Sequence, residues 1–372
     1  MKKIVFFISL ISSILAHSQS LRVGEWRDHL SYTYAYDVCE VGNSMYVSTD
    51  RALFEYNTLD NSIERLNTLN KLSDIGVSSI GTDGSLLIVA YENGNIDLIR
   101  GDSKVNLPDI KRASLIADKR INHINIDNNL AYLSCGFGIV VVDINREEVK
   151  DTYFIGEYGE QENVLSTTIA HNFIYAATNK GLYRAEVYES NLADYHSWEK
   201  LSTHSQSCID MLESFSGLLF VNLHGEEYNT DTLYHFDGSN WLVFEQESSN
   251  MSIKASSKHL VLTSRYNVSV FDQNLNRTHY LYSGQFNIEN TDFNSAIFTD
   301  KDEFWIADKY NGLLHNNGDF FESIKHIYQY RTPRSLKAFS SFFILTIPVL
   351  YGPYFAFQAE NMSYGLEYIT PV

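Results

Sequence analysis

The residue types that usually perform catalysis or bind metals are scattered in this sequence, without the spacing that such sites require. The sequence contains no H-x-x-H, H-E-x-x-H or C-x-x-C motif, no Walker loop and no G-x-S-x-G nucleophile elbow. Ser214 lies in ESFSG, which lacks the leading glycine of an elbow, and His123 and His171 occupy positions that other polar residues fill in the repeats described below. We therefore predict structural roles for these three residues, no metal site, no cofactor and no enzymatic activity.

Two further groups have a chemical and a structural interpretation. The acidic segment GEEYNTDT at 225–232 has oxygen ligands for Ca²⁺, but it lacks the D-x-D-x-D-G spacing, which favours a solvated loop. Cys39, Cys135 and Cys208 cannot all pair within one chain, and the sequence places no histidine partner beside any of them. We expect all three to be small buried apolar residues.

Composition excludes several classes of function. The 372 residues carry a formal net charge of −18, which is incompatible with general binding to nucleic acids and with adhesion to bare anionic membranes. With 25 Tyr, 22 Phe and only 5 Pro, the chain is rich in residues that favour β-strands.

The first residues have the features of an export signal. Lys2 and Lys3 precede an apolar run at 4–15 that is too short to span a bilayer comfortably, and small residues follow at Ala16 and Ser18. We predict a signal peptide over residues 1–18 and an exported protein. The alternative is an uncleaved membrane anchor.

A repeat of about 43 residues determines the predicted fold. Seven copies contain two strands separated by a polar turn, a loop that often contains glycine, and a third strand. One apolar residue of the second strand recurs at Tyr46, Ile88, Tyr132, Tyr175, Phe220, Leu262 and Trp305, at spacings of 42 to 45. This period, with three or four strands per unit, is typical of β-propellers.

We therefore predict an all-β, seven-bladed propeller over residues 19–330. A fourth strand follows most copies, at 62–66, 151–156, 197–201, 240–245 and 320–324. The similar segment at 25–30 precedes the first copy, so we expect it to close the ring by joining the last blade, which would remove an exposed sheet edge. The alternative is fewer blades and a separate sandwich.

The repeat stops near residue 331. Residues 339–358 carry no charge and are long enough to span a bilayer, although Pro348, Gly352 and Pro353 would break such a helix. We leave 331–372 as an unassigned tail. Its abrupt change of composition favours a truncation or a shifted reading frame over a membrane anchor.

The architecture predicts one binding surface. In a propeller, the loops between second and third strands and the connections between blades emerge on the same face. Aromatic, amide and isolated cationic side chains there suit sugars or anionic glycolipid heads. The candidate ligand-binding residues are Arg51, Tyr91, Glu92, Phe137, Lys180, His224, Arg265, Lys309 and Tyr310.

Several segments resemble known families. The seventh copy, DEFWIADKYNGLLHNNG, resembles the repeat of two-component-regulator propellers. The chain from about 24 to 330 resembles the N-terminal propeller of PorZ-like components of the type IX secretion system of Bacteroidetes. The segments that carry this resemblance are GEWRDHLSY (24–32), AYENGNIDLI (90–99), DKRINHI (118–124), CGFGIVVVDI (135–144), EVKDTYFIGEYG (148–159), IYAATNKGLYRAEV (174–187) and NLADYHSW (191–198).

The resemblance implies a non-catalytic part in protein secretion. PorZ-like proteins have two propellers and a C-terminal sorting domain. They sit at the cell surface with a sortase and associated outer-membrane proteins, and they are associated with anionic lipopolysaccharide. One propeller is recognisable in this sequence. The alternative is the periplasmic ligand-sensing propeller of a hybrid two-component regulator. An enzymatic propeller would need clustered His and Asp metal ligands.

Overall fold

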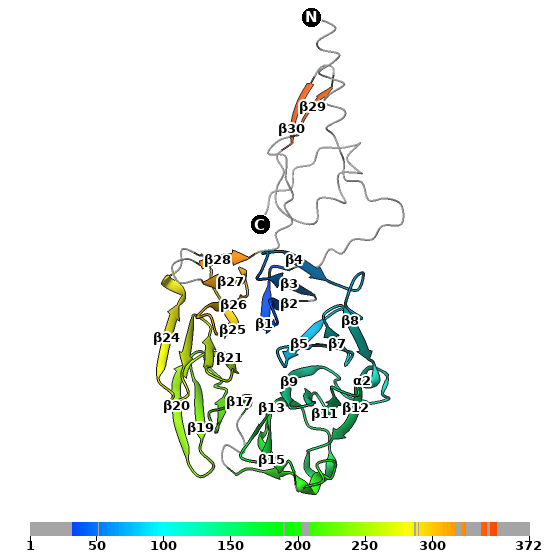
Figure 1. Ribbon diagram of the computed structural model, residues 1–372, viewed down its shortest axis with the longest axis vertical. Coiled ribbons are helices and arrows are strands. Elements are labelled where there is room, and N and C mark those ends of the chain that lie inside the picture. The colour runs from blue at the N-terminus through cyan, green and yellow to red at the C-terminus, as the bar shows by residue number, and fades with distance from the viewer. Residues whose placement is uncertain are drawn as a thin grey trace, which may run out of the picture. The chain divides into compact units, whose positions relative to one another are not determined.

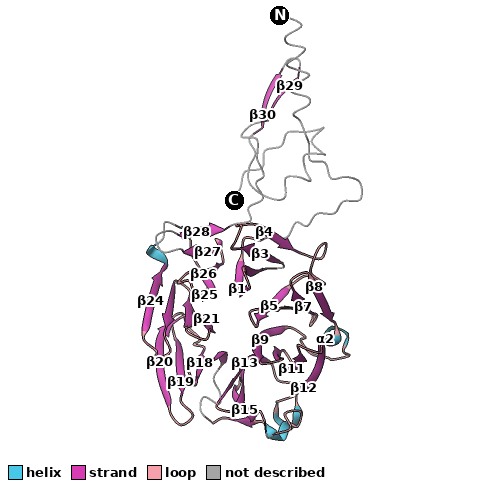
Figure 2. Cartoon of the chain, in the orientation of Figure 1, coloured by secondary structure: helices cyan, strands magenta, loops and turns pink. Residues whose placement is uncertain are grey.

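Seven four-stranded antiparallel sheets surround a central channel (Figure 1). The structure is a computed structural model that describes residues 32–50, 52–188, 190–202, 208–285, 288, 290–316, 321–324, 336–340 and 343–347. Strands account for most of the described residues, as Figure 2 shows. Each sheet is one blade, and its four strands follow one another in the sequence. The predicted seven-bladed propeller is confirmed.

The strands of blades 1 to 4 lie between residues 35 and 200. Blade 1 comprises β1 (Ala35–Val41), β2 (Ser44–Thr49), β3 (Leu53–Asn57) and β4 (Ile63–Leu66). Blade 2 comprises β5 (Val77–Thr82), β6 (Leu87–Tyr91), β7 (Ile96–Arg100) and β8 (Ser103–Leu107). Blade 3 comprises β9 (Ile121–Asp127), β10 (Leu130–Cys135), β11 (Gly138–Asp143) and β12 (Glu148–Tyr153). Blade 4 comprises β13 (Val164–Ala170), β14 (Phe173–Thr178), β15 (Gly181–Glu186) and β16 (Glu199–Lys200).

The strands of blades 5 to 7 lie between residues 209 and 324. Blade 5 comprises β17 (Ile209–Phe215), β18 (Leu218–Leu223), β19 (Asp231–Phe236) and β20 (Trp241–Ser248). Blade 6 comprises β21 (Asn250–Ala255), β22 (Leu260–Ser264), β23 (Asn267–Phe271) and β24 (Arg277–Tyr282). Blade 7 comprises β25 (Phe293–Phe298), β26 (Phe304–Asp308), β27 (Gly312–Asn316) and β28 (Phe321–Ile324). The short helices are α2 (Asp109–Arg112), η1 (Glu157–Gly159), η2 (Tyr195–Ser197) and η3 (Ser283–Gln285).

The core consists of apolar clusters between neighbouring blades. The recurring apolar residues all fall on second strands and are at least 94% buried, from Tyr46 in blade 1 to Trp305 in blade 7. Each of the seven clusters in the described residues joins two adjacent sheets. Because a single blade cannot bury both of its faces, stability requires stacking of neighbours around the ring.

Blade 7 closes the ring against blade 1. Trp305 packs on Tyr56, with 5.4 Å between the ring centroids, and both belong to a cluster shared by the two blades. Asn294 donates a hydrogen bond to the carbonyl of Ala35 at 2.7 Å. The segment 25–30, predicted to join this blade, lies outside the described residues. The fourth strand of blade 7 is β28, from the end of the same repeat.

Glycine occurs in the predicted loops, whereas two outer strands were not predicted. The loops between second and third strands often contain glycine as predicted, and Gly94, Gly138 and Gly312 there have positive φ angles of 81°, 150° and 73°. The outer strands β8 and β24 were not predicted, because SKVNL and RTHYLY show little alternation of apolar and polar residues.

Residues beyond 326 form a separate unit of the chain. Its described part is an antiparallel hairpin of β29 (Leu336–Ser340) and β30 (Phe343–Ile347). The predicted signal peptide and most of the predicted tail, 331–372, lie outside the described residues. Among the residues that the structure describes, no helix has the length and apolar character needed to cross a bilayer.

Candidate functional site at the loop face and channel mouth

The central channel forms a cavity. Its volume is about 710 Å³, and the first strands of the blades line its wall. This size falls in the range of about 300–1,000 Å³ typical of ligand sites. We call the face that carries the turns between second and third strands and the connections between blades the loop face. The other face carries the remaining turns.

A ring of bulged residues lines the channel. In each first strand, one residue near the strand start has no partner in the second strand, which shifts the register there. We call these residues the channel-mouth ring, because β-bulges redirect side chains and each first strand starts at the loop face. They are Tyr36, Ser78, Asn122, Leu165, Asp210, Met251 and Asn294, and all line the cavity. The ring thus combines polar groups with an aromatic and two aliphatic side chains.

Charged groups meet inside the channel. Lys254 of blade 6 reaches past blade 7, forms an ion pair with Asp37 of blade 1, and donates to the carbonyl of Val38 at 2.6 Å. This contact ties non-adjacent blades together at the inner wall. Burial lowers the pKa of His123 to about 4, against the attraction of Asp37. His123 is therefore neutral at pH 7, and its Nδ1 lies 3.4 Å from the hydroxyl of Ser166.

Glu213 is the channel group with a pKa near neutrality. Burial raises its pKa to about 7, although hydrogen bonds from backbone amides and the positive charge of Lys254 oppose this shift. The amide of Ser214 donates to its Oε1 at 2.9 Å. Burial also raises the pKa of the Cys39 thiol to about 12, which removes it as a nucleophile at neutral pH.

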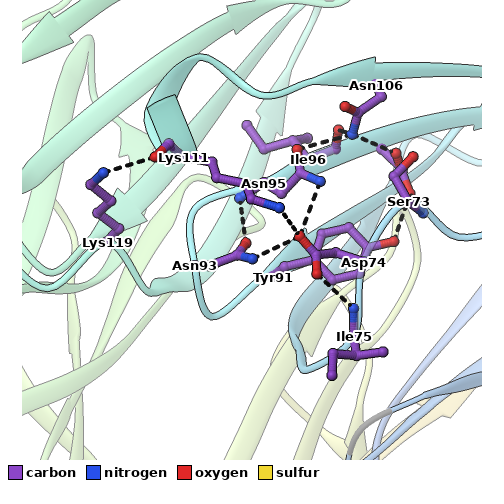
Figure 3. Close-up of polar contacts among 11 residues, drawn as sticks. Ser73, Asp74, Ile75, Tyr91, Asn93, Asn95, Ile96, Asn106, Lys111 and Lys119 are labelled. Carbon is purple, nitrogen blue, oxygen red and sulfur yellow. Dashed lines mark hydrogen bonds and ion pairs between the residues drawn. The ribbon is translucent and has the colours of Figure 1, made fainter. Parts of the chain in front are cut away.

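A polar network of several buried and half-buried groups lies on the loop face of blade 2 (Figure 3). Its centre is the fully buried carboxylate of Asp97 on β7. Asp97 accepts hydrogen bonds from the hydroxyl of Tyr91 at 2.6 Å, the amide of Ser73 at 2.7 Å and the side chain of Asn106 at 2.9 Å. Three donors replace the water that this carboxylate loses on burial, and they fix the blade 1 to blade 2 connection.

A second carboxylate extends this network toward solvent. Asp74 accepts hydrogen bonds from Asn93 at 2.7 Å and from Lys111 of α2 at 2.5 Å (Figure 3). Partial burial acts to raise the pKa of Asp74, but the hydrogen bonds from Lys111, Asn93 and the amide of Ile75 outweigh it and lower the pKa. We call Ser73, Asp74, Tyr91, Asn93, Asn95, Asp97, Asn106 and Lys111 the blade 2 lock.

Lys180 and His224 of the loop face are not isolated, because each lies beside a carboxylate of the same chain. The ammonium of Lys180 lies 2.7 Å from Glu162, and His224 Nδ1 lies 3.2 Å from Asp231. The hydrogen bond to Glu162 raises the pKa of Lys180. The expectation of isolated cations is therefore corrected.

Three predicted residues gather at the junction of blades 6 and 7. Arg265 Nε lies 3.6 Å from one carboxylate oxygen of Asp292, and Lys309 Nζ lies 3.9 Å from the other. The same Lys309 ammonium lies 5.5 Å above the ring of Tyr310, which is 43% exposed. Arg265 and Lys309 are far apart in the sequence, so the sequence did not indicate that both lie near the carboxylate of Asp292.

Other predicted site residues lie elsewhere. Tyr91 and Phe137 are buried in the core, so their assignment as ligand-binding residues of an exposed loop is corrected. Each follows or ends a second strand, where its ring packs between blades. Glu92 is exposed and pairs with Arg120 at 2.7 Å. Arg51 lies outside the described residues.

The histidine, serine and cysteine residues considered from the sequence for catalysis or metal binding lie in structural environments. His171 Nε2 lies 2.8 Å from the carbonyl of Gly217, and Ser214 lies on β17. Cys39 and Cys135 are buried as predicted, whereas Cys208 is only half-buried, with Sγ 3.2 Å from Asn179 Oδ1. Within the described residues, no three His, Cys, Asp or Glu side chains are grouped in a way that could hold a metal ion.

In the acidic segment at 225–232, the carboxylate of Asp231 accepts hydrogen bonds from backbone amides of the protein. Asp231 is 97% buried and accepts hydrogen bonds from the amides of Gly225 at 2.9 Å and Asn250 at 2.8 Å. These contacts use its two oxygens to join blades 5 and 6.

The sequence gave no direct indication of the channel-mouth ring. Its members lie ten or eleven residues before the recurring apolar residue of the second strand, for example Tyr36 before Tyr46 and Asn294 before Trp305. That nearly constant offset is the signal that could have identified them, but six residue types occupy the seven positions, and only Asn122 and Asn294 share one.

Comparisons with known proteins agree with the family resemblance. Residues 45–199, from blade 1 into blade 4, match the model of the N-terminal β-propeller domain of PorZ of the type IX secretion system. A structure of PorZ, an essential surface component of this system in Porphyromonas gingivalis, superposes with a TM-score of 0.67 at 17% identity. The match covers 82% of this chain, and the chain spans 40% of that structure.

Other propellers share the fold at lower similarity. The extracellular domain of a hybrid two-component system of B. thetaiotaomicron has a TM-score of 0.57 at 14% identity, covering 79% of this chain and 41% of that one. YCF48 bound to a D1 peptide has a TM-score of 0.54 at 12% identity, covering 77% and 93%. No curated protein matches the chain. The predicted resemblance to both propeller families is confirmed, and at these identities the structures establish the fold.

Proposed function

We propose that this chain is an exported, non-catalytic component of the type IX secretion system, with a propeller that binds partner proteins at the cell surface. The match of residues 45–199 to the PorZ N-terminal propeller is the observation that carries this proposal. The partners are the sortase and associated outer-membrane proteins of the attachment complex. Anionic lipopolysaccharide is the second ligand class.

The loop face supports a protein-binding role. Lys180 and Lys309 have side chains that are 64% and 42% exposed although each lies near a carboxylate, so partly solvated charge pairs lie on the loop face. Such pairs contribute little to stability, but they direct the encounter with a charged partner and fix its orientation. In the YCF48 structure, a propeller of the same fold is bound to a peptide.

Affinity capture from the native bacterium tests the proposal. The full gene product, tagged and expressed from its own locus, is expected to enrich the sortase and associated outer-membrane proteins identified by mass spectrometry. Replacing Lys180 and Lys309 by Glu should reduce this enrichment. Replacing Arg146 and Lys258, which lie in turns of the other face, by Glu should leave it unchanged. Absence of the attachment-complex proteins from the capture would overturn the proposal.

A ligand-sensing propeller of a hybrid two-component regulator is the second candidate. The structural similarity to the extracellular domain of such a system favours it. The two candidates differ in what the gene encodes beyond codon 372. A second propeller with a sorting domain supports the secretion component, whereas a transmembrane helix and a histidine kinase support the sensor.

A further inference from the structure

A cleft lined by tyrosines lies at the loop-face end of blades 5 and 6, outside the central channel. Its volume is about 210 Å³. Tyr228 comes from the β18–β19 loop, Tyr266 from the β22–β23 turn, and Tyr280 and Tyr282 from the outer strand β24, at the yellow edge of Figure 1. We call these four residues the tyrosine cleft. Their exposed fractions range from 40% to 60%, so four aromatic rings remain partly in water at one site.

The backbone around the cleft is held in place by hydrogen bonds. The amide of Asn229 donates to the hydroxyl of Ser249 at 3.0 Å, and that hydroxyl donates to Asn229 Oδ1 at 2.9 Å. The amide of Ser283 donates to the carbonyl of Tyr266 at 2.8 Å, which joins the turn to the end of β24. Tyr280 and Tyr282 are two positions apart on one strand, so they share a face. The rings are therefore presented from an ordered backbone, which lowers the entropic cost of binding.

Polar groups complete the lining. Asn229, Asn267, Ser248, Ser249 and Ser264 supply amides and hydroxyls. Among the residues that the structure describes, the buried hydroxyl of Ser248 has no hydrogen-bond partner, an uncommon state for a buried polar atom. Arg265 adds a guanidinium that is 39% exposed and lies 3.6 Å from Asp292. The cleft thus offers donors and acceptors beside aromatic faces.

We infer that the tyrosine cleft binds the pyranose rings of a glycan. A sugar ring has an apolar C–H face that packs on an aromatic ring, and its edge carries hydroxyls that pair with amides and Ser hydroxyls. The cleft is smaller than pockets of about 300–1,000 Å³ that enclose drug-sized ligands, so it accommodates about one sugar ring of a longer chain. The inference deepens the glycan-binding part of the proposed function and rests on that part.

Two sources could supply this chemistry. One is the polysaccharide part of lipopolysaccharide, and the other is a free oligosaccharide. The probes are therefore the lipid-free polysaccharide released from purified lipopolysaccharide by mild acid, maltohexaose and cellohexaose. Binding of each to the full chain is measured by isothermal titration calorimetry and saturation-transfer NMR.

The variants distinguish weaker binding caused by lost ring stacking from weaker binding caused by a loss of folding. Tyr266→Ala with Tyr280→Ala should weaken binding at least about tenfold, because two stacking surfaces are lost. Tyr266→Phe with Tyr280→Phe keeps the rings and should retain most of the affinity. Tyr188→Ala removes a 71% exposed ring on a different blade and should leave binding unchanged. Circular dichroism melting of each variant verifies that it is folded.

Each outcome decides the inference. Tyrosine-dependent binding of the released polysaccharide alone supports it with lipopolysaccharide as the source, and binding of a hexaose supports it with a free glycan. If none of the three probes binds, or if the double alanine variant binds as the wild type does, the inference is overturned. Capture of the attachment complex is a separate measurement, so a protein scaffold without a glycan site would be recognised by successful capture and absent glycan binding.

Discussion

The blade 2 lock and the tyrosine cleft occupy corresponding loops of the same ring, yet they use their polar and aromatic side chains in opposite ways. In the lock, Tyr91 is buried and its hydroxyl pairs with Asp97. In the cleft, Tyr228 is 60% exposed, and the hydroxyl of Ser248 has no hydrogen-bond partner within the described part of the chain. The polar groups of the lock form hydrogen bonds with one another and stabilise a connection between blades. The cleft presents aromatic rings and polar groups with which another molecule can interact.

This difference shows how a repeated fold separates stability from recognition. Each blade must bury its faces against its neighbours, and this requirement constrains the strands. The loops have no such constraint, so one pair of blades uses them to hold the ring together and another presents them to solvent. Substitutions in the lock should therefore reduce stability, and substitutions in the cleft should reduce binding alone.

Removing the central carboxylate of the lock should have the largest effect. Asp97→Ala removes the acceptor of the Tyr91 hydroxyl and of the Ser73 amide and one of the acceptors of the Asn106 side chain, and should lower the free energy of unfolding by about 3 kcal/mol. Urea unfolding followed by tryptophan fluorescence measures this. Asp102→Ala, an exposed position in the same blade, is the control and should change stability by less than about 0.5 kcal/mol. Equal losses in both variants would show that the lock is not a stabilising centre.

A glycine between two residues of the lock, Asn93 and Asn95, tests how tightly their turn is packed. Gly94 has φ +81°, and a Cβ there would lie 2.6 Å from Ile110 Cγ2. Gly94→Ala should cost about 2 kcal/mol, because overpacking adds to backbone strain. Gly84 has φ +91° with nothing within 4 Å of a Cβ, so Gly84→Ala isolates the backbone strain and should cost about 1 kcal/mol. Identical denaturation midpoints for the two variants would argue against tight packing at Gly94.

The sharpest comparison uses one hydroxyl from each region. Tyr91→Phe removes a donor to a buried carboxylate and should lower the free energy of unfolding by about 1.5 kcal/mol. Tyr228→Phe removes a hydroxyl from a largely exposed ring and should leave stability unchanged within about 0.5 kcal/mol. Thermal melting by circular dichroism measures both. A larger loss for Tyr228→Phe would reverse the assignment of roles.

Acid should remove the stabilisation that Asp74 contributes at the outer part of the lock. The folded state lowers the pKa of Asp74 below its ordinary value of 3.8, so its contribution to stability is present above pH 3.8 and is lost as the pH falls through the lowered value. Asp74→Asn should lower the free energy of unfolding by about 1 kcal/mol at pH 7, because the pairing with Lys111 is partly exposed.

Urea unfolding of wild type and Asp74→Asn across pH 2 to 7 tests this sign. The difference between them should shrink below pH 3.8. A difference that grows on acidification would contradict it.

Much of the fold could be predicted because the repeat is a local pattern. The spacing from Tyr46 to Trp305 predicted seven second strands, and each of these residues lies on one. The strand β24 was missed because its residues RTHYLY are mostly exposed, so no alternation marks them.

The candidate site was less predictable. Lys309 and Tyr310 lie in the turn between β26 and β27, where a loop was expected; Tyr310 is exposed and Lys309 is half-buried. Their neighbour Asp292, whose carboxylate lies near Lys309 and Arg265, could not be inferred. Tyr91 and Phe137 look like loop aromatics in the sequence, but blade-to-blade packing buries them.

The sequence by itself determined the number of blades, the strand order and the positions of the turns, because hydrophobic periodicity and turn residues act over a few neighbours along the chain. Only the tertiary structure decided which loop residues face a partner and which face the core. That decision depends on how the blades lie together, as in the Lys254–Asp37 pair and in the cleft that Tyr228 and Tyr266 line from two blades. Residues that lie far apart in the sequence meet there only when the ring closes.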